Sequence, residues 1–278
     1  MNQNIDAYND QNDLNWVDSH AHTWSEELTS DYQEIMNRAW SSGISEVIEV
    51  GVDVPTSKLA GELASTDRRI HAVCGIHPHD ADKYGEQYLD LENLAASGNF
   101  VAIGEIGLDF YRNFSPPDQQ YEAFKKQLEL ARISNLPVVI HSRNADSETY
   151  SILKKWVMKV GNYLGPSRPI GMLHCFSGNS ELSMKYQELG FLISLAGPVT
   201  YKKNVQLQKV AKLLPLSKML IETDCPYLTP IPYRGKLNEP AYVKATGIFI
   251  ANIKNKDVAS IAEATTENAR NLFGINRG

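Results

Sequence analysis

The sequence predicts an α/β protein of the (β/α)8 barrel class, in which eight parallel strands alternate with helices. Short segments rich in β-branched residues alternate eight times with longer amphipathic segments, as repeated strand–helix units do. The length of 278 residues is also close to the roughly 250 residues of a single barrel. Because no linker-like stretch separates the units, residues 13–278 are expected to form one domain.

The eight expected strands are short and apolar. Several lack strict alternation of apolar and polar residues, as expected for parallel strands with helices on both faces. We expect them at residues 14–18, 45–50, 70–75, 100–105, 137–141, 171–175, 191–195 and 218–223. An open, doubly wound sheet is the alternative, but no Gly-x-Gly-x-x-Gly loop follows an early strand, so nothing favours a dinucleotide-binding fold.

Two of the intervening segments carry clear helix-ending signals. The segment DYQEIMNRAWSSG is expected to end at Gly43, because glycine readily adopts the left-handed conformation that follows many helices. The segment PDQQYEAFKKQLELARISN is expected to end before Leu136 and Pro137, because a residue before proline disfavours the helical conformation. The helical and strand patterns therefore alternate as the barrel requires.

The composition is that of a globular protein that folds in water, with 42% hydrophobic and 22% charged residues. No apolar run approaches the ~18–20 residues that a membrane span needs. The first residues, MNQNIDAYNDQN, are polar and acidic, unlike a signal peptide, so 1–12 are expected to be a disordered tail. We therefore expect a cytoplasmic protein, with reduced thiols because its three cysteines lack Cys-x-x-Cys spacing.

The formal net charge of −6 argues against a broad electrostatic footprint for nucleic acid. It does not exclude an enzyme that handles phosphates, since bound divalent cations are the largest local charges in such a site. The charge of the whole chain therefore leaves the function open.

Most of the chemically active side chains fall at the ends of expected strands. In barrel enzymes these C-terminal strand ends carry the chemistry, and among the seven histidines only His71 falls at a strand start. In VDSHAHTW, the two histidines are two positions apart, so in a strand they share a face. Residues at these ends are His20, His22, His77, His79, Glu105, His141, His174 and Asp224.

These residue types predict a metal site. Imidazole and carboxylate groups together suit divalent ions such as Zn, Mn or Mg. Four of these histidines, together with the two carboxylates, would already be too many ligands for one hydrolytic ion that must keep a position open. Two ions ~3.5–4 Å apart, bridged by a carboxylate, would use all six and would acidify a bound water.

The chain after the tail resembles the TatD family of metal-dependent hydrolases. The matching segments are VDSHAH, GIHPHD, AIGEIGLDFYR, PVVIHSR, HCFSG and ETDCPYLTP…RGKLNEP, in family order across residues 17–240. The resemblance implies a TIM barrel of the metal-dependent amidohydrolase type with divalent-ion-dependent nuclease activity. Family members include 3′→5′ exonucleases and other DNases, and some are D-aminoacyl-tRNA deacylases.

The resemblance also implies a ligand set for two divalent ions. The predicted ligands are His20, His22 and Asp224 for one ion, and His141 and His174 for the other. Glu105 would bridge the two ions, in the place that a carboxylated lysine occupies in other barrels of the superfamily.

Asp224 is expected to be the general base, because a carboxylate beside the attacking water can orient it and take its proton. The alternative is a ligand with no proton role. Glu222 lies two residues earlier and is expected to support a ligand histidine. Asp109 is expected to anchor its loop or a ligand histidine rather than perform chemistry.

Four further residues are candidates for substrate binding. His77 and His79 have no place in the set of six ligands, so hydrogen bonds to a phosphate are expected, with a structural loop-capping role as the alternative. Arg143 and Arg234 could each bind a phosphate through two parallel hydrogen bonds. For Arg234 the alternative is a solvated loop charge.

Basic and aromatic residues at the same strand ends suit a single nucleic-acid strand, whose bases can stack while its backbone is neutralised. They are Arg112, Lys202, Lys203, Lys236, Trp24, Tyr111, Phe114, Phe176, Tyr201, Tyr227 and Tyr233. The function expected is therefore that of a metal-dependent 3′→5′ exodeoxyribonuclease acting on single-stranded DNA or 3′ ends. No membrane and no obligate protein partner are expected.

Three alternatives remain open. The first is a D-aminoacyl-tRNA deacylase, which would take tRNA as its partner. The second is an amidohydrolase for a small amide, lactone or phosphotriester. The third is a binding protein without catalysis, for which a structural zinc with no open coordination position would be required.

Overall fold

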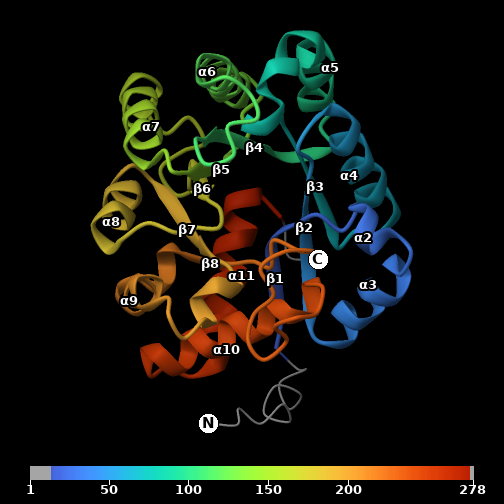
Figure 1. The fold of residues 1–278 in the computed structure, drawn as a ribbon, viewed down its shortest axis with the longest axis vertical. Coiled ribbons are helices and arrows are strands. Elements are labelled where there is room, and N and C mark those ends of the chain that lie inside the picture. The colour runs from blue at the N-terminus through green and yellow to red at the C-terminus, as the bar shows by residue number, and fades with distance from the viewer. Residues whose placement is uncertain (1–13, 276–278) are drawn as a thin grey trace. The chain divides into compact units, whose positions relative to one another are not determined.

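The computed structural model describes residues 14–275, and in this part of the chain the predicted (β/α)8 barrel fold is confirmed. The strands form one sheet in the order β1-β2-β3-β4-β5-β6-β7-β8, and helices alternate with them along the chain (Figure 1). The strands are β1 Trp16–Ala21, β2 Ile44–Val50, β3 Ile70–Cys74, β4 Phe100–Asp109, β5 Val138–Arg143, β6 Gly171–Leu173, β7 Phe191–Leu195 and β8 Met219–Ile221.

The helices follow the strands in sequence. The α-helices are α2 Glu26–Thr29, α3 Tyr32–Ser41, α4 Val54–Thr66, α5 Tyr84–Ala96, α6 Pro117–Ile133, α7 Asp146–Val160, α8 Ser180–Glu188, α9 Val205–Leu213, α10 Val243–Lys254 and α11 Val258–Phe273. Short 3-10 helices are η1 Pro78–Lys83, η2 Gly197–Thr200, η3 Leu216–Lys218 and η4 Pro240–Tyr242. Within residues 14–275, no helix combines the length and the apolar character needed to cross a membrane.

The described chain divides into two compact units. The first takes the residues up to Ile48, then Cys175–Met184 and Ile193–Arg270. The second takes Glu49–His174, Lys185–Leu192 and the residues from Asn271 onwards. The predicted tail at 1–12 lies outside the described residues, and the single domain expected for 13–278 stays a prediction.

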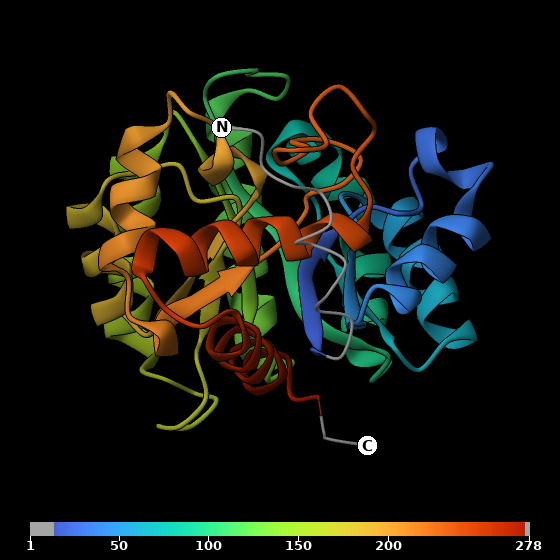
Figure 2. The same cartoon turned by 90° about the horizontal axis from the view of Figure 1, so that it is seen from below.

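In the first unit, the ends of β1 and β8 lie side by side. The backbone N–H of Asp224 donates to the carbonyl of His20 at 3.0 Å, and that of His22 donates to the carbonyl of Cys225 at 3.0 Å. Helix α10 packs against both strands (Figure 2). This packing brings His20 of β1, and His22 just after the strand, next to the acidic segment that follows β8.

Gly247 allows the close approach of α10 to β1. A Cβ atom at this position would lie 2.3 Å from the ring of Trp16, whose side chain is fully buried. Gly247→Ala is therefore expected to lower the free energy of unfolding by about 1–3 kcal/mol, as overpacking does, despite the better helix propensity of alanine. The measurement is chemical denaturation of both proteins.

Gly85→Ala provides the matched control. Gly85 lies in the first turn of α5, and a Cβ there would meet no atom within 4 Å. This variant is expected to be neutral or stabilising by up to ~1 kcal/mol. Equal stability changes in the two variants would contradict the packing argument.

In the second unit, β4 is longer than predicted. The sequence analysis ended this strand at Glu105, but the structure continues it to Asp109, because the segment from Ile106 pairs in parallel with β5. The strands approach closely at Gly107, where a Cβ would lie 1.9 Å from the carbonyl oxygen of His141. The expected end at Glu105 is therefore wrong, and Asp109 becomes the strand's last residue.

Two strand ends are shorter than predicted. β6 ends at Leu173 and β8 at Ile221. His174 is therefore the first residue after β6, and Asp224 lies in the segment that follows β8. Asp224 has a φ of 56° and Cys175 a φ of 43°, a left-handed conformation incompatible with a continuing strand. The helix ends agree better, since α3 and α6 both end near their predicted residues.

Candidate metal centre

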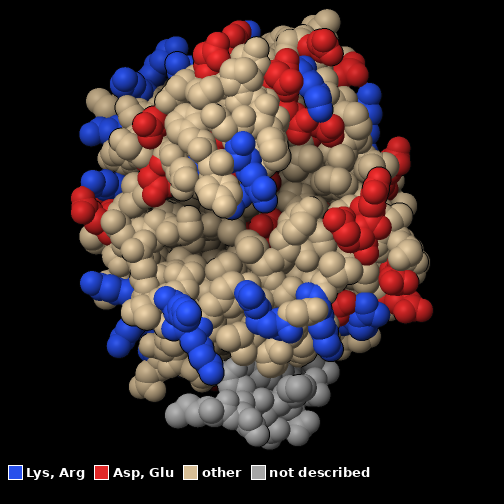
Figure 3. Space-filling view, viewed as in Figure 1, with Lys and Arg blue, Asp and Glu red and all other residues tan. Residues whose placement is uncertain are grey.

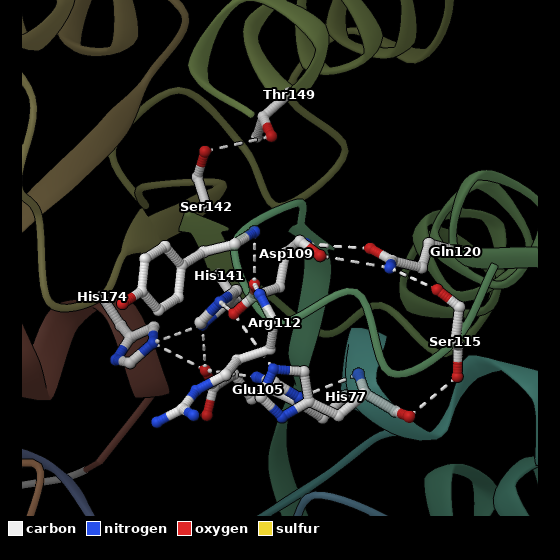
Figure 4. A network of polar contacts seen from close by, with 12 residues as sticks. His77, Glu105, Asp109, Arg112, Ser115, Gln120, His141, Ser142, Thr149 and His174 are labelled. Carbon is white, nitrogen blue, oxygen red and sulfur yellow. Dashed lines mark hydrogen bonds and ion pairs between the residues drawn. The ribbon is translucent and has the colours of Figure 1, made fainter. Parts of the chain in front are cut away.

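Three histidines of the second unit converge on one oxygen of Glu105. Oε1 of this carboxylate lies 2.7 Å from Nδ1 of His141, 2.7 Å from Nε2 of His174 and 3.3 Å from Nε2 of His77. Figure 4 shows these side chains pointing toward one another. β4 and β5 supply Glu105 and His141, while the other two histidines follow β3 and β6. We call these four residues the Glu105 cluster.

Asp109 orients two of the neighbouring imidazoles. Its Oδ2 lies 3.1 Å from Nε2 of His141 and 3.0 Å from Nε2 of His79. Its Oδ1 accepts the backbone N–H groups of Tyr111 at 2.9 Å and Arg112 at 2.8 Å. A carboxylate bonded to one imidazole nitrogen sets the ring orientation and leaves the other nitrogen for an ion. In His141 that other nitrogen, Nδ1, faces the cluster.

The surroundings of Glu105 keep this carboxylate in the form that binds a divalent ion. Burial raises the pKa of Glu105, but the charges of His174 and His77 and the hydrogen bond with His141 outweigh it and hold the pKa well below its usual value. Burial lowers the pKa of His77 to about 4, so this imidazole is neutral near pH 7. An ionised carboxylate and a neutral imidazole are the forms that bind divalent ions.

Asp109→Asn is expected to weaken divalent-ion binding by about 10–100-fold, the usual effect of losing a carboxylate that orients a ligand histidine. Asparagine keeps the shape of the side chain but removes the charge that faces His141 and His79. The measurement is calorimetric titration with Mn²⁺. Asp90→Asn, which removes an exposed carboxylate paired with Lys58, serves as the control and is expected to bind the ion like the wild type.

A second cluster lies in the first unit. Nε2 of His20 is 3.1 Å from Nε2 of His22, and Oδ1 of Asp224 is 3.8 Å and 3.5 Å from these two nitrogens. Both imidazoles are buried. The three residues, called here the His20 cluster, offer ligand atoms that all lie within 4.8 Å of one another.

A residue that was not predicted from the sequence, Asp18, holds the segment after β8 in place. Asp18 is completely buried, and its carboxylate accepts the backbone N–H of Thr223 at 2.8 Å and its hydroxyl at 2.5 Å. Asn238 donates to the carbonyl of the same threonine at 2.8 Å. Thr223 precedes Asp224, so these bonds determine where that carboxylate lies. In the sequence, the feature that could have pointed to Asp18 is its position two residues before the His-x-His pair.

The remaining predicted residues have other contacts. Glu222 is fully buried and accepts the backbone N–H of Cys175 at 2.5 Å; its support of a ligand histidine stays a prediction. The guanidinium of Arg143 lies 4.0 Å from the ring centre of Tyr111. That of Arg234 lies 4.1 Å from the ring centre of Tyr201, so phosphate binding by either arginine also stays a prediction.

Both clusters fit divalent ions. Each combines imidazole nitrogens with a carboxylate oxygen at distances short enough for a shared ion, and Zn, Mn and related ions accept this mixture. The donor sets could therefore hold a metal ion in each unit.

Comparisons with known proteins agree with this reading. The model of a family described as TatD related DNase matches residues 17–274. A protein of Bacillus subtilis named uncharacterized metal-dependent hydrolase YabD is 40% identical over 260 residues, which cover 93% of this chain and 99% of that protein. A protein of Escherichia fergusonii named 3′-5′ ssDNA/RNA exonuclease TatD is 35% identical over 258 residues, covering 90% and 96%.

A solved structure is also similar. The crystal structure of YJJV, a TatD homolog from Escherichia coli, matches with a TM-score of 0.85 and 25% sequence identity. The match covers 94% of this chain and 98% of that structure. Fold and sequence comparisons therefore agree over nearly the whole length.

Proposed function

This chain belongs to the TatD family of metal-dependent hydrolases, and from that premise we propose that it is a 3′→5′ exodeoxyribonuclease acting on single-stranded DNA. The observation that carries the proposal is the Glu105 cluster, in which three histidines surround one carboxylate oxygen. A relative named as a single-stranded DNA and RNA exonuclease supports the substrate. Imidazole and carboxylate ligands of this kind suit the divalent ions that assist phosphodiester hydrolysis.

The residues of each cluster have proposed roles in metal binding. One divalent ion would be held by His20, His22 and Asp224, and another by Glu105, His141 and His174. When bound, such ions lower the pKa of water and stabilise negative charge at phosphorus. The identity of the ions (Mg, Mn or Zn) and the bridging role of Glu105 stay predictions.

The protein's own groups would then carry the proton and position the substrate. We assign Asp224 as the general base, whose carboxylate orients the attacking water and accepts its proton. His77 is neutral; its Nδ1 accepts the backbone N–H of His79 at 3.1 Å, and its Nε2 faces Glu105 at 3.3 Å. Its one N–H would therefore reach a phosphate oxygen only by turning away from that carboxylate. His79 is held by Asp109 and is proposed to contact the same substrate.

The experiment is a paired assay on the purified protein. One substrate is a 5′-labelled single-stranded DNA oligonucleotide, and the other is a D-aminoacyl-tRNA, each with Mg²⁺, Mn²⁺, Zn²⁺ or EDTA. Metal-dependent shortening from the 3′ end is expected, and the variant Asp224→Ala should lose it. That variant also excludes a contaminating nuclease.

Other outcomes would reject the proposal. Ester cleavage without shortening would assign the site to a tRNA deacylase, and hydrolysis of only small amides, lactones or phosphotriesters would assign it to an amidohydrolase. A cytoplasmic location and the absence of an obligate protein partner stay predictions.

A further inference from the structure

Two large aromatic side chains are exposed on one short loop, between β4 and α6. Tyr111 is 58% exposed and Phe114 is 66% exposed. A single exposed apolar residue is ordinary, but neighbouring ones indicate a binding surface. The loop follows Asp109, the residue that bonds His141 and His79, so the exposed rings belong to the surroundings of the Glu105 cluster.

The loop is held at both ends by hydrogen bonds. At its start, Oδ1 of Asp109 accepts the backbone N–H of Tyr111 at 2.9 Å. At its end, Gln120 donates to the carbonyl of Ser115 at 2.8 Å, as Figure 4 shows. Ser115 donates its hydroxyl to the carbonyl of His79 at 2.7 Å. A loop ordered in this way loses little entropy when a ligand binds.

Each exposed ring contacts a polar group of the site. The guanidinium of Arg143 lies over Tyr111, with 4.0 Å from Cζ to the ring centre. Phe114 contacts the imidazole of His79 edge to face, with 4.8 Å between the ring centres. His79 in turn lies 4.3 Å from His77 between ring centres. The imidazole of His79 therefore connects Phe114 to His77, the histidine that faces the Glu105 carboxylate.

The neighbouring helices α5, α6 and α7 do not provide a basic surface for nucleic acid. Lys and Arg are interspersed with Asp and Glu over the part of Figure 3 where Figure 1 places α5, α6 and α7. The whole chain has 27 basic and 33 acidic residues. A nucleic-acid substrate would therefore need affinity from a source other than long-range attraction, and exposed aromatic rings supply it by stacking.

We propose that Tyr111 and Phe114 are a stacking platform for unpaired bases of a single strand whose phosphate is bound at the Glu105 cluster. This inference rests on the proposed nuclease function and names the residues that would bind the unpaired bases of its substrate; bases within a duplex have no free face. Arg143 covers part of Tyr111, and its charge lies where it can pair with a backbone phosphate. The platform explains why both rings remain exposed on an ordered loop.

The test measures binding of a short fluorescein-labelled oligothymidylate with phosphorothioate linkages, which resist hydrolysis, in the presence of Mn²⁺. Tyr111→Ala and Phe114→Ala are each expected to raise the Kd by roughly 5- to 150-fold, the effect of losing one stacked base. Tyr111→Phe keeps the ring and is expected to restore binding. Leu89→Ala, which removes a side chain that is 70% exposed on α5, is the matched control and is expected to bind like the wild type.

An abasic oligonucleotide of the same length separates stacking from structural damage. The wild type is expected to bind it less tightly than oligothymidylate, and the two alanine variants should no longer distinguish these ligands. Unchanged oligothymidylate binding in both alanine variants would overturn the platform. A loss of binding in Tyr111→Phe as large as in Tyr111→Ala would also overturn the platform. A change of oligomeric state without a change of Kd would overturn it as well and would indicate a protein interface.

Failure of the nuclease proposal gives a different result. In that case the wild type would not shorten an ordinary oligonucleotide with any divalent ion, whatever residues occupy 111 and 114. Shortening that is unaffected by the alanine variants at limiting substrate would retain the nuclease and reject only the platform.

Discussion

Replacing Asp224 with asparagine is expected to reduce oligonucleotide hydrolysis by about 10²–10⁴-fold, the usual contribution of a positioned general base. The amide has the shape of the carboxylate but cannot take a proton from water, and it is a weaker ligand for a divalent ion. Asparagine is the conservative choice because residue 224 has a φ of 56°, a left-handed conformation that asparagine tolerates better than most residues.

The measurement is kcat for a single-stranded oligonucleotide with saturating Mn²⁺, together with the thermal unfolding curve. Asp90→Asn is the control for the chemical change, since that carboxylate is exposed on α5 and pairs with Lys58. If the kcat of Asp224→Asn lies within tenfold of the wild-type value, Asp224 is not the general base. A large loss of stability in the variant would instead assign the residue a structural role.

Removing divalent ions is expected to abolish hydrolysis and to lower the Tm. An ion that binds only the folded chain stabilises it by about 4 kcal/mol at a thousandfold excess over its Kd. For a chain of this size that corresponds to a Tm change on the order of 10 °C. The measurement is thermal unfolding after EDTA treatment, and again after addition of Mn²⁺, Zn²⁺ or Mg²⁺.

The gain in Tm from an added ion is expected to increase with pH. A protonated imidazole cannot bind an ion, so ion binding must release protons from the histidine ligands. Burial lowers the pKa of His141, but the hydrogen bonds with Asp109 and Glu105 outweigh it, and the net pKa is raised. The gain in Tm from Mn²⁺ should therefore be larger near pH 8 than near pH 6.

Two histidine variants make this result specific. His141→Gln should lose most of the gain in Tm from the added ion, because it removes a nitrogen 2.7 Å from the Glu105 carboxylate. His71→Gln should keep the gain, because His71 lies at the start of β3, the opposite end from the cluster. An equal gain in all three proteins would show that the ion binds elsewhere.

Local patterns in the sequence determined much of the fold. The strand and helix periods, the glycine after α3 and the proline after α6 are properties of neighbouring residues, so they could be read without the structure. Since parallel strands in a barrel direct their C-terminal ends to one side, the same reading singled out His141, His174 and Glu105. The structure places both of these histidines 2.7 Å from the same oxygen of Glu105.

The tertiary structure decided what depends on contacts between distant residues. β4 extends to Asp109 because it pairs with β5. The register between two strands cannot be read from the periodicity of either segment. The same pairing brings Asp109 against His141, and packing brings His77 to Glu105. These contacts join residues far apart in the chain, whereas the sequence specifies only which residue types are available to make them.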